Sequence, residues 1–265
     1  MKIFSTLIIL LLPFLLAAQI NQTDAEGRRH GLWKKQYPNG RLMYEGCFRH
    51  GKPVGEWKRY HEGGQTKAVI VYAEDSDSAY AQLFNPHGKK IAEGNYLDKT
   101  KAGKWKFFSG EQKIAEEHYS QGLKHGISKT FYQSGELLQS TEWKEGIQEG
   151  KHQVFYKNGE PYMQCKYSRN QRNGLCLTYH QNGRVEMEAN YKNNLRHNDW
   201  KFYDENGTHL YTLKYDDGKL LNPEVRDSID NLHMNNLEKG RHTIPDPEKF
   251  MEDPSEYMRK MNIYR

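Results

Sequence analysis

Cysteine is scarce: the 265 residues include three, Cys47, Cys165 and Cys176. At most one internal disulfide can form, which excludes a small scaffold held together by many disulfides. No Cys-x-x-Cys or His-Glu-x-x-His motif occurs among the cysteines and the twelve histidines. The usual sequence signs of a zinc site are therefore missing, and we expect no metal.

Neither sign of charge is in large excess. The chain has 39 basic and 34 acidic residues, a formal net charge of +5, and the two signs are mixed along it. A nucleic-acid-binding surface normally gathers its basic residues on one face. We therefore expect no nucleic-acid partner.

Long apolar runs are absent except at the start of the sequence. Lys2 supplies a positive beginning, the run from Ile3 to Leu16 follows, and two alanines precede Gln19. This run, broken by Pro13, falls short of the roughly 20 apolar residues of a spanning helix. The pattern predicts a secretory signal peptide over residues 1–19, and hence an exported protein that is periplasmic, on the outer surface or secreted. An uncleaved membrane anchor is the alternative.

The signatures of an active site are missing too. No Gly-x-Ser-x-Gly segment places a serine on a nucleophile elbow, and no glycine-rich loop opens a helix to hold a phosphate. We therefore expect no catalytic residues, no cofactor and no enzymatic activity.

What the sequence does have is a repeat with a period of about 24 residues. A leading glycine recurs at Gly31, Gly55, Gly103, Gly126, Gly150 and Gly174, with Ala79 and Asn198 in the other two repeats. Two residues later, at what we call the tryptophan position, stand Trp33, Trp57, Ala81, Trp105, Ser128, His152, Cys176 and Trp200. An aromatic residue closes each repeat: Phe48, Tyr72, Tyr96, Tyr119, Trp143, Tyr167, Tyr191 and Tyr215.

Each repeat is typical of one β-hairpin. Turn sequences such as Tyr37–Gly40 fall in the middle of the repeats. Apolar and polar residues alternate after the turns, most regularly from Val185 to Tyr191. Residues 27–218 are therefore predicted to form an all-β array of about eight antiparallel hairpins. Because open sheets of more than about ten strands rarely stay flat, we expect an elongated, twisted, solenoid-like array.

The repeat also carries a family resemblance. The run from Glu45 to Gly55 reads Glu-Gly-Cys-Phe-Arg-His-Gly-Lys-Pro-Val-Gly and resembles a MORN repeat, and Gly122–Gly126 repeats part of it. With a tryptophan after the last glycine and Asn-Gly turns, the array is most similar to bacterial MORN-variant repeats, many of which are described as antitoxins. The resemblance implies a β-sheet scaffold that binds partners. Some members of the family are linked to membranes or lipids.

Aromatic rings are the candidate partner-binding residues. They comprise tryptophans at the tryptophan position and aromatic residues three positions later: Trp33, Trp57, Tyr60, Trp105, Phe108, Trp200 and Tyr203. Flat rings provide affinity at a low cost in conformational entropy. The alternative is that these rings form the core between repeats, although a single-layer sheet cannot bury both of its faces.

Cys165 and Cys176 are the candidate disulfide. If the strands around them pair through the intervening turn so that Tyr167 faces Cys176, the two cysteines are diagonal neighbours. Diagonal neighbours lie roughly 7 to 8 Å apart, beyond the roughly 4.4 to 6.8 Å between the Cα atoms of a usual disulfide. This register argues against a bond, and the alternative is that the cysteines pack as small apolar side chains.

Residues 219–265 read as a separate helical tail or cap. Asn222-Pro223 is a typical helix start, and four apolar residues fall on one face of the expected helix: Val225, Ile229, Leu232 and Leu237. Two further starts follow, at Asp246-Pro247 and Asp253-Pro254. We expect short helices that either cap the edge strand of the last hairpin or dock a partner.

Together these features predict an exported, non-catalytic repeat scaffold that binds another macromolecule, with a protein as the expected partner. Two alternatives stay open. One is an antitoxin or immunity-type protein that neutralises a toxin, and the other is an envelope module that binds lipid at a membrane surface or glycan. A cytoplasmic toxin partner is incompatible with a cleaved signal peptide, whereas a lipid or glycan binder predicts retention on liposomes or cell-wall polysaccharide.

Overall fold

The computed structural model describes residues 20–74 and 76–241. Within them the chain forms twenty β-strands and one α-helix. It divides into two compact units, Met1–Ile147 and Gln148–Arg265. The predicted signal peptide and the helix starts at Asp246 and Asp253 lie outside the described residues.

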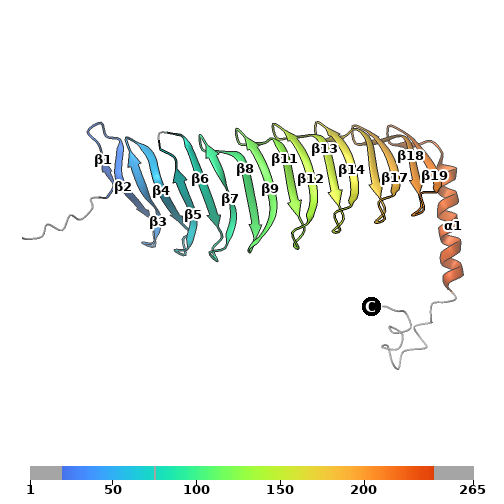
Figure 1. Ribbon diagram of the computed structural model, residues 1–265, viewed down its shortest axis with the longest axis horizontal. Coiled ribbons are helices and arrows are strands. Elements are labelled where there is room, and N and C mark those ends of the chain that lie inside the picture. Colours follow the sequence, from blue (N-terminus) through green and yellow to red (C-terminus); the bar gives the residue numbers. More distant parts are fainter. Residues whose placement is uncertain (1–19, 75, 242–265) are drawn as a thin grey trace, which may run out of the picture. The chain divides into compact units, whose positions relative to one another are not determined.

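The first unit is one open antiparallel sheet in which successive hairpins lie side by side (Figure 1). Its strands are β1 (Gln22–Thr23), β2 (Arg29–Gln36), β3 (Leu42–Arg49), β4 (Lys52–Tyr60), β5 (Thr66–Tyr72), β6 (Ser78–Phe84), β7 (Lys90–Leu97), β8 (Thr100–Ser109), β9 (Gln112–Ser120), β10 (Leu123–Lys124), β11 (Gly126–Phe131) and β12 (Leu137–Lys144). No helix covers either face among the described residues of this unit.

The second unit continues the same pattern and ends in a helix (Figure 1). Its elements are β13 (Ile147–Phe155), β14 (Pro161–Ser168), β15 (Gln171–Arg172), β16 (Gly174–Tyr179), β17 (Val185–Lys192), β18 (Leu195–Tyr203), β19 (His209–Asp216), β20 (Lys219–Leu220) and α1 (Pro223–Arg241). The predicted all-β array of antiparallel hairpins with helix at the C-terminal end is therefore confirmed.

Two kinds of turn build this array, and both use residues at positive φ, which is glycine in the turns within repeats and glycine or another residue in the turns between them. In the middle of a repeat the amide of Gly40 donates to the carbonyl of Tyr37 at 3.0 Å, with Gly40 at a φ of 80°. Between repeats the chain reverses through two residues of positive φ, such as His50 at 48° and Gly51 at 82°. Such two-residue turns match the twist of the flanking strands, which keeps neighbouring hairpins in register.

The core lies on one face of each sheet, which we call the tryptophan face because it carries the tryptophan position. Where two repeats meet, the tryptophan position faces a residue of the preceding repeat across the strands. Three of these cross-strand pairs are Ile70 with Ala81, Gly94 with Trp105, and Ala189 with Trp200. We call them seam pairs, because they join one hairpin to the next.

A large ring at one side of a seam pair requires a small residue at the other. A Cβ built on Gly94 would lie 2.5 Å from Cδ2 of Trp105, and a Cβ on Gly46 would overlap the ring of Trp57. Trp105 is completely buried as a result. The seam pairs therefore set both the packing of the tryptophan face and the close approach of neighbouring hairpins.

The seam tryptophans also satisfy the backbone beside them. Most seams contain a β-bulge, for example between Gly94 and Asn95. The indole N–H of Trp105 donates to the carbonyl of Asn95 at 2.9 Å, and that of Trp200 donates to the carbonyl of Asn190 at 2.9 Å. The ring thus fills the seam and binds a carbonyl that the bulge removes from the ladder.

Asparagine side chains cap the first and last long strands. Asn21 accepts the amide of Lys34 at 2.8 Å on the outer side of β2. At the other end Asn222 accepts the amide of Lys214 at 2.7 Å and donates to the carbonyl of Thr212 at 2.9 Å. Asn222 therefore covers the edge of β19 with its side chain, where the sequence had suggested a helix cap.

Helix α1 packs on the sheet only at its beginning. Val225 contacts the apolar cluster of the second unit, and Ile229 is half-buried. Leu232 and Leu237, expected on the same face, are 62% and 68% exposed. The described part of the tail thus begins with the short strand β20 and continues as one helix of 19 residues, anchored to the sheet at Val225.

Candidate functional site: the tryptophan face and its third repeat

The candidate binding aromatics do not form one surface. Trp57 and Trp200 are 8% and 6% exposed, Trp105 is fully buried, and Trp33 is half-buried. Each donates its indole N–H to a backbone carbonyl; for Trp57 the acceptor is Cys47, at 3.0 Å. These tryptophans are therefore mainly core residues of the seams, the alternative that the sequence left open.

The other three candidate rings have contacts elsewhere. The hydroxyl of Tyr60 donates to Glu45 at 2.7 Å, Phe108 lies under the ammonium of Lys90 at 4.5 Å, and Tyr203 packs edge-on against His209. Glu45 projects from the face opposite the tryptophans, since successive side chains of a strand alternate. The pairs Trp57 and Tyr60, and Trp105 and Phe108, are thus divided between the two faces.

We call this opposite face the ion-pair face, because lysine and glutamate side chains pair across its strands. Lys34 lies 3.1 Å from Glu45, and Lys104 lies 3.0 Å from Glu116. Burial and the hydrogen bond to Glu45 raise the pKa of Tyr60 to about 12, and the hydrogen bond from Tyr60 lowers the pKa of Glu45. The ion-pair face is a solvated surface whose polar groups already have partners.

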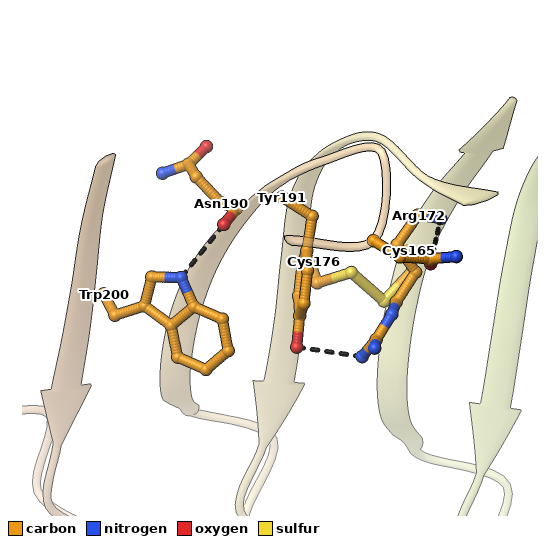
Figure 2. The surroundings of a disulfide bond; sticks show 7 residues. Cys165, Arg172, Cys176, Asn190, Tyr191 and Trp200 are labelled. Atoms are coloured by element: carbon orange, nitrogen blue, oxygen red, sulfur yellow. Dashed lines mark hydrogen bonds between the residues drawn. A yellow bond between two sulfur atoms is a disulfide. The ribbon is translucent and has the colours of Figure 1, made fainter. Parts of the chain in front are cut away.

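Cys165 and Cys176 form a disulfide, and the diagonal register expected for them is wrong (Figure 2). Strands β14 and β16 pair Gln164 with Leu177, so the same register sets Cys165 directly opposite Cys176, with 4.2 Å between their Cα atoms. The expectation failed because β15 and an irregularity before Gly174 separate the turn from β16. The disulfide is a seam pair, with a covalent bond in place of a ring, whereas Cys47 is free and exposed.

A basic residue four positions before the tryptophan position locks most repeats on this face. Arg172 donates to the hydroxyl of Tyr191 at 2.9 Å, as Figure 2 shows, and Arg196 donates to Tyr215 at 2.9 Å. Lys101 lies over the rings of Trp105 and Tyr119. The residues at this position, which we call the cation position, are Arg29, Pro53, Asp77, Lys101, Lys124, Gln148, Arg172 and Arg196. The basic residue is missing at Pro53, Asp77 and Gln148, and the first two of these belong to consecutive repeats.

The third repeat departs from the pattern in three further ways. Ala81 replaces the tryptophan, Ile70 replaces the small residue opposite it, and Ala79 replaces the leading glycine. The pairing of β5 with β6 runs without a bulge. No tryptophan of this repeat therefore fills its seam on the tryptophan face.

A groove of about 990 Å³ lies at this seam, across β4 to β7. Its lining includes Arg59, Ile70, Tyr72, Ala79, Leu83 and Tyr96. We call it the third-repeat groove. It has the size of a ligand-binding cleft, its floor is apolar because Ile70 and Leu83 line it, and Ala81 stands where four other repeats have a tryptophan.

Hydrogen-bond donors around the third-repeat groove lack partners. Among the described residues, the hydroxyls of Tyr72 and Tyr96 form no hydrogen bond, although Tyr191 and Tyr215 do at the same position of their repeats. Burial raises the pKa of both Tyr72 and Tyr96, and the positive charge of Arg59 partly opposes the rise at Tyr72. Both phenols therefore stay neutral and able to donate at physiological pH.

A separate polar cluster lies in the second unit. His197, Asp216 and Asp217 place their ligand atoms within 4.8 Å of one another, a grouping that the sequence analysis missed. The cluster is exposed at both aspartates, and the ammonium of Lys192 lies 3.1 Å from Asp217. A lysine in the cluster competes with a cation, so we interpret these residues as an ion-pair network at the turn.

These features define a class of protein: an open β-hairpin repeat array with a ring-packed face. Five of its repeats match the MORN repeat variant, over residues 29–50, 53–74, 124–145, 172–193 and 196–217. The chain is a MORN-repeat protein, as the sequence predicted. The matches leave out residues 75–123, which contain strands β6 and β7 of the third-repeat groove.

No curated protein matches the chain. A mutant of S. aureus TarM in complex with fondaparinux, alpha-GlcNAc-glycerol and UDP is 13% identical, over 53% of this chain and 20% of that one, with a TM-score of 0.16. A second TarM crystal structure is 14% identical over 56% and 20%, with a TM-score of 0.17. The chain thus spans about a fifth of these structures.

Proposed function

We propose that this protein is an exported scaffold that binds a protein partner through its tryptophan face and carries out no catalysis. MORN repeats are generally binding or scaffold modules without catalytic activity. The observation that carries the proposal is the third-repeat groove, an apolar cleft with unpartnered donors in an otherwise regular array. Regular repeats build a rigid surface, and a break in the repeat gives that surface a specific site.

Export is supported by the first nineteen residues and by the disulfide. Disulfides persist in oxidising compartments such as the periplasm and are rare in the cytosol. A covalent seam between Cys165 and Cys176 is in keeping with such a location. No helix in the described part of the chain is long and apolar enough to cross a membrane.

The test is affinity capture of the full chain, tagged at its C-terminus, from the envelope of its own cells, with mass spectrometry of what is retained. We expect a mature N-terminus near Gln19 or Ile20 and an enriched envelope or secreted protein. An N-terminus at Met1 together with a cytoplasmic toxin would overturn the proposal in favour of an antitoxin. Retention of the chain on liposomes or cell-wall polysaccharide, with no protein captured, would favour a lipid or glycan module.

A further inference from the structure

The third-repeat groove has the chemistry of a site for an anionic, partly apolar ligand. Its rim carries Lys52, Arg59, Lys67 and Lys99 against Asp77 and Asp98. Lys52 is already paired with Asp77 at 3.3 Å. Among the described residues, Arg59, Lys67 and Lys99 form no ion pair. The groove therefore presents more positive charge than negative charge and attracts acceptors.

Its donors lie at both ends of the apolar floor. Arg59 faces Ala68 near one end of β5, and Tyr72 ends the same strand four residues later. At about 3.3 Å per residue, these positions are about 13 Å apart. Donors that come from positions spread along the floor match an extended peptide, which carries carbonyl and carboxylate groups along its whole length.

We propose that the third-repeat groove binds an extended acidic segment of a protein partner. Leucine or aromatic side chains of that segment lie on the floor beside Ile70 and Leu83. Its carboxylates bind Arg59 at one end, and its oxygen atoms accept hydrogen bonds from Tyr72 and Tyr96 at the other. This inference rests on the proposed function, since it takes the partner to be a protein.

The groove can be filled with a residue pair that the array already uses at another seam. The variant Ile70→Gly with Ala81→Trp would recreate the glycine and tryptophan seam pair found at Gly94 and Trp105. The neighbouring seam accommodates this pair with a β-bulge that β5 and β6 lack, so folding of the variant is checked by circular dichroism before binding is compared. The variant would remove the space that the partner segment requires while leaving the rim charges in place.

Two further variants remove polar groups without altering the packing. Arg59→Gln removes an exposed charge, and Tyr72→Phe with Tyr96→Phe removes two hydroxyls that have no partner among the described residues. The matched control is Tyr191→Phe, at the same repeat position but in the second unit, where Arg172 binds the hydroxyl.

The probe is a display library of random ten-residue peptides, selected on the wild-type chain and counter-selected on the filled variant. We expect enrichment of peptides that carry aspartate or glutamate within a few residues of leucine, phenylalanine or tryptophan. Fluorescence anisotropy with an enriched peptide should show binding lost in the filled variant. Arg59→Gln and the double tyrosine variant should each weaken it about tenfold, and Tyr191→Phe should leave it unchanged.

Several results would overturn the inference. They are the absence of any enriched peptide, enrichment of neutral or basic peptides, and binding unaffected by Arg59→Gln and the double tyrosine variant. Binding of a fluorescent fatty acid in the groove, with no peptide bound, would instead assign the groove to a lipid ligand. If the filled variant still captures the envelope partner as well as wild type does, this groove site fails while the scaffold function stands.

Discussion

The seam pairs make a quantitative prediction about Gly94. Gly94→Ala would bring a Cβ within 2.5 Å of the Trp105 ring, which has no exposed surface and no room to move without leaving the core. If the ring stays, overpacking costs about 1–3 kcal/mol. If the ring is expelled, a tryptophan burying about 150–250 Å² loses up to about 4–6 kcal/mol at 25 cal/mol per Å². We therefore expect the free energy of unfolding to fall by about 3 kcal/mol.

A double-mutant cycle isolates the cause. Trp105→Ala alone should cost about 3–5 kcal/mol, because it leaves a cavity. On that background Gly94→Ala has no ring to meet and should be close to neutral. The coupling between the two changes should therefore be about 2 kcal/mol or more, since residues in contact are non-additive. Urea unfolding followed by circular dichroism measures each free energy, and hydrogen exchange locates the loss at β7 and β8.

The matched control is Gly63→Ala. Gly63 lies in an exposed turn, and a Cβ there would meet only the movable end of the Gln65 side chain. We expect its effect to stay within about 0.5 kcal/mol. The seam model is refuted if Gly94→Ala is as mild as Gly63→Ala, or if the effects of Gly94→Ala and Trp105→Ala simply add.

Two further predictions concern the ends and the covalent seam. The disulfide joins residues 11 positions apart in the sequence. Cys165→Ala with Cys176→Ala should therefore lower the free energy of unfolding of the second unit by about 3 kcal/mol and make its urea unfolding insensitive to reductant. An unchanged midpoint of urea unfolding would contradict this prediction. Burial would raise the pKa of Asp24, but hydrogen bonds from the Arg28 backbone, His50 and the Arg28 side chain lower it to about 2. The contribution of the Asp24 carboxylate to stability should therefore be complete above about pH 4 and lost as the pH falls towards 2. Asp24→Asn should remove this part of the acid unfolding transition. Acid unfolding curves that are identical for the wild type and Asp24→Asn would contradict the prediction.

Much of the fold could be predicted because the same turn and strand pattern recurs from repeat to repeat. The glycine of Tyr37–Gly40 and the alternation from Val185 to Tyr191 fix hairpins and faces locally. The error at Cys165 and Cys176 arose because pairing was extended through the turn as if the ladder were regular. The leading glycine Gly174, at a φ of 93°, is itself the sign of an irregularity there, since positive φ favours glycine.

The candidate site was harder to predict. Trp57 and Tyr60 stand three residues apart and were grouped by sequence, yet strand alternation sends them to opposite faces. The groove depends on what is missing from one repeat and on which residue of the next strand lies opposite. Two features of the sequence could have indicated the groove. Pro53 and Asp77 replace the basic residue at the cation position in consecutive repeats. Ile70 and Ala81 also reverse the usual seam pair, in which the larger residue stands at the tryptophan position.

The seam pairs also bear on how such arrays diversify. Because each seam is a contact between two facing side chains, its content can change from glycine and tryptophan to isoleucine and alanine, or to a disulfide, while the turns on either side are unaffected. Two codons can then change how one seam is packed and whether it leaves a cleft on the tryptophan face. Binding surfaces in this architecture can therefore evolve one seam at a time. A designer could also introduce the same seam pair in another repeat to place a cleft there.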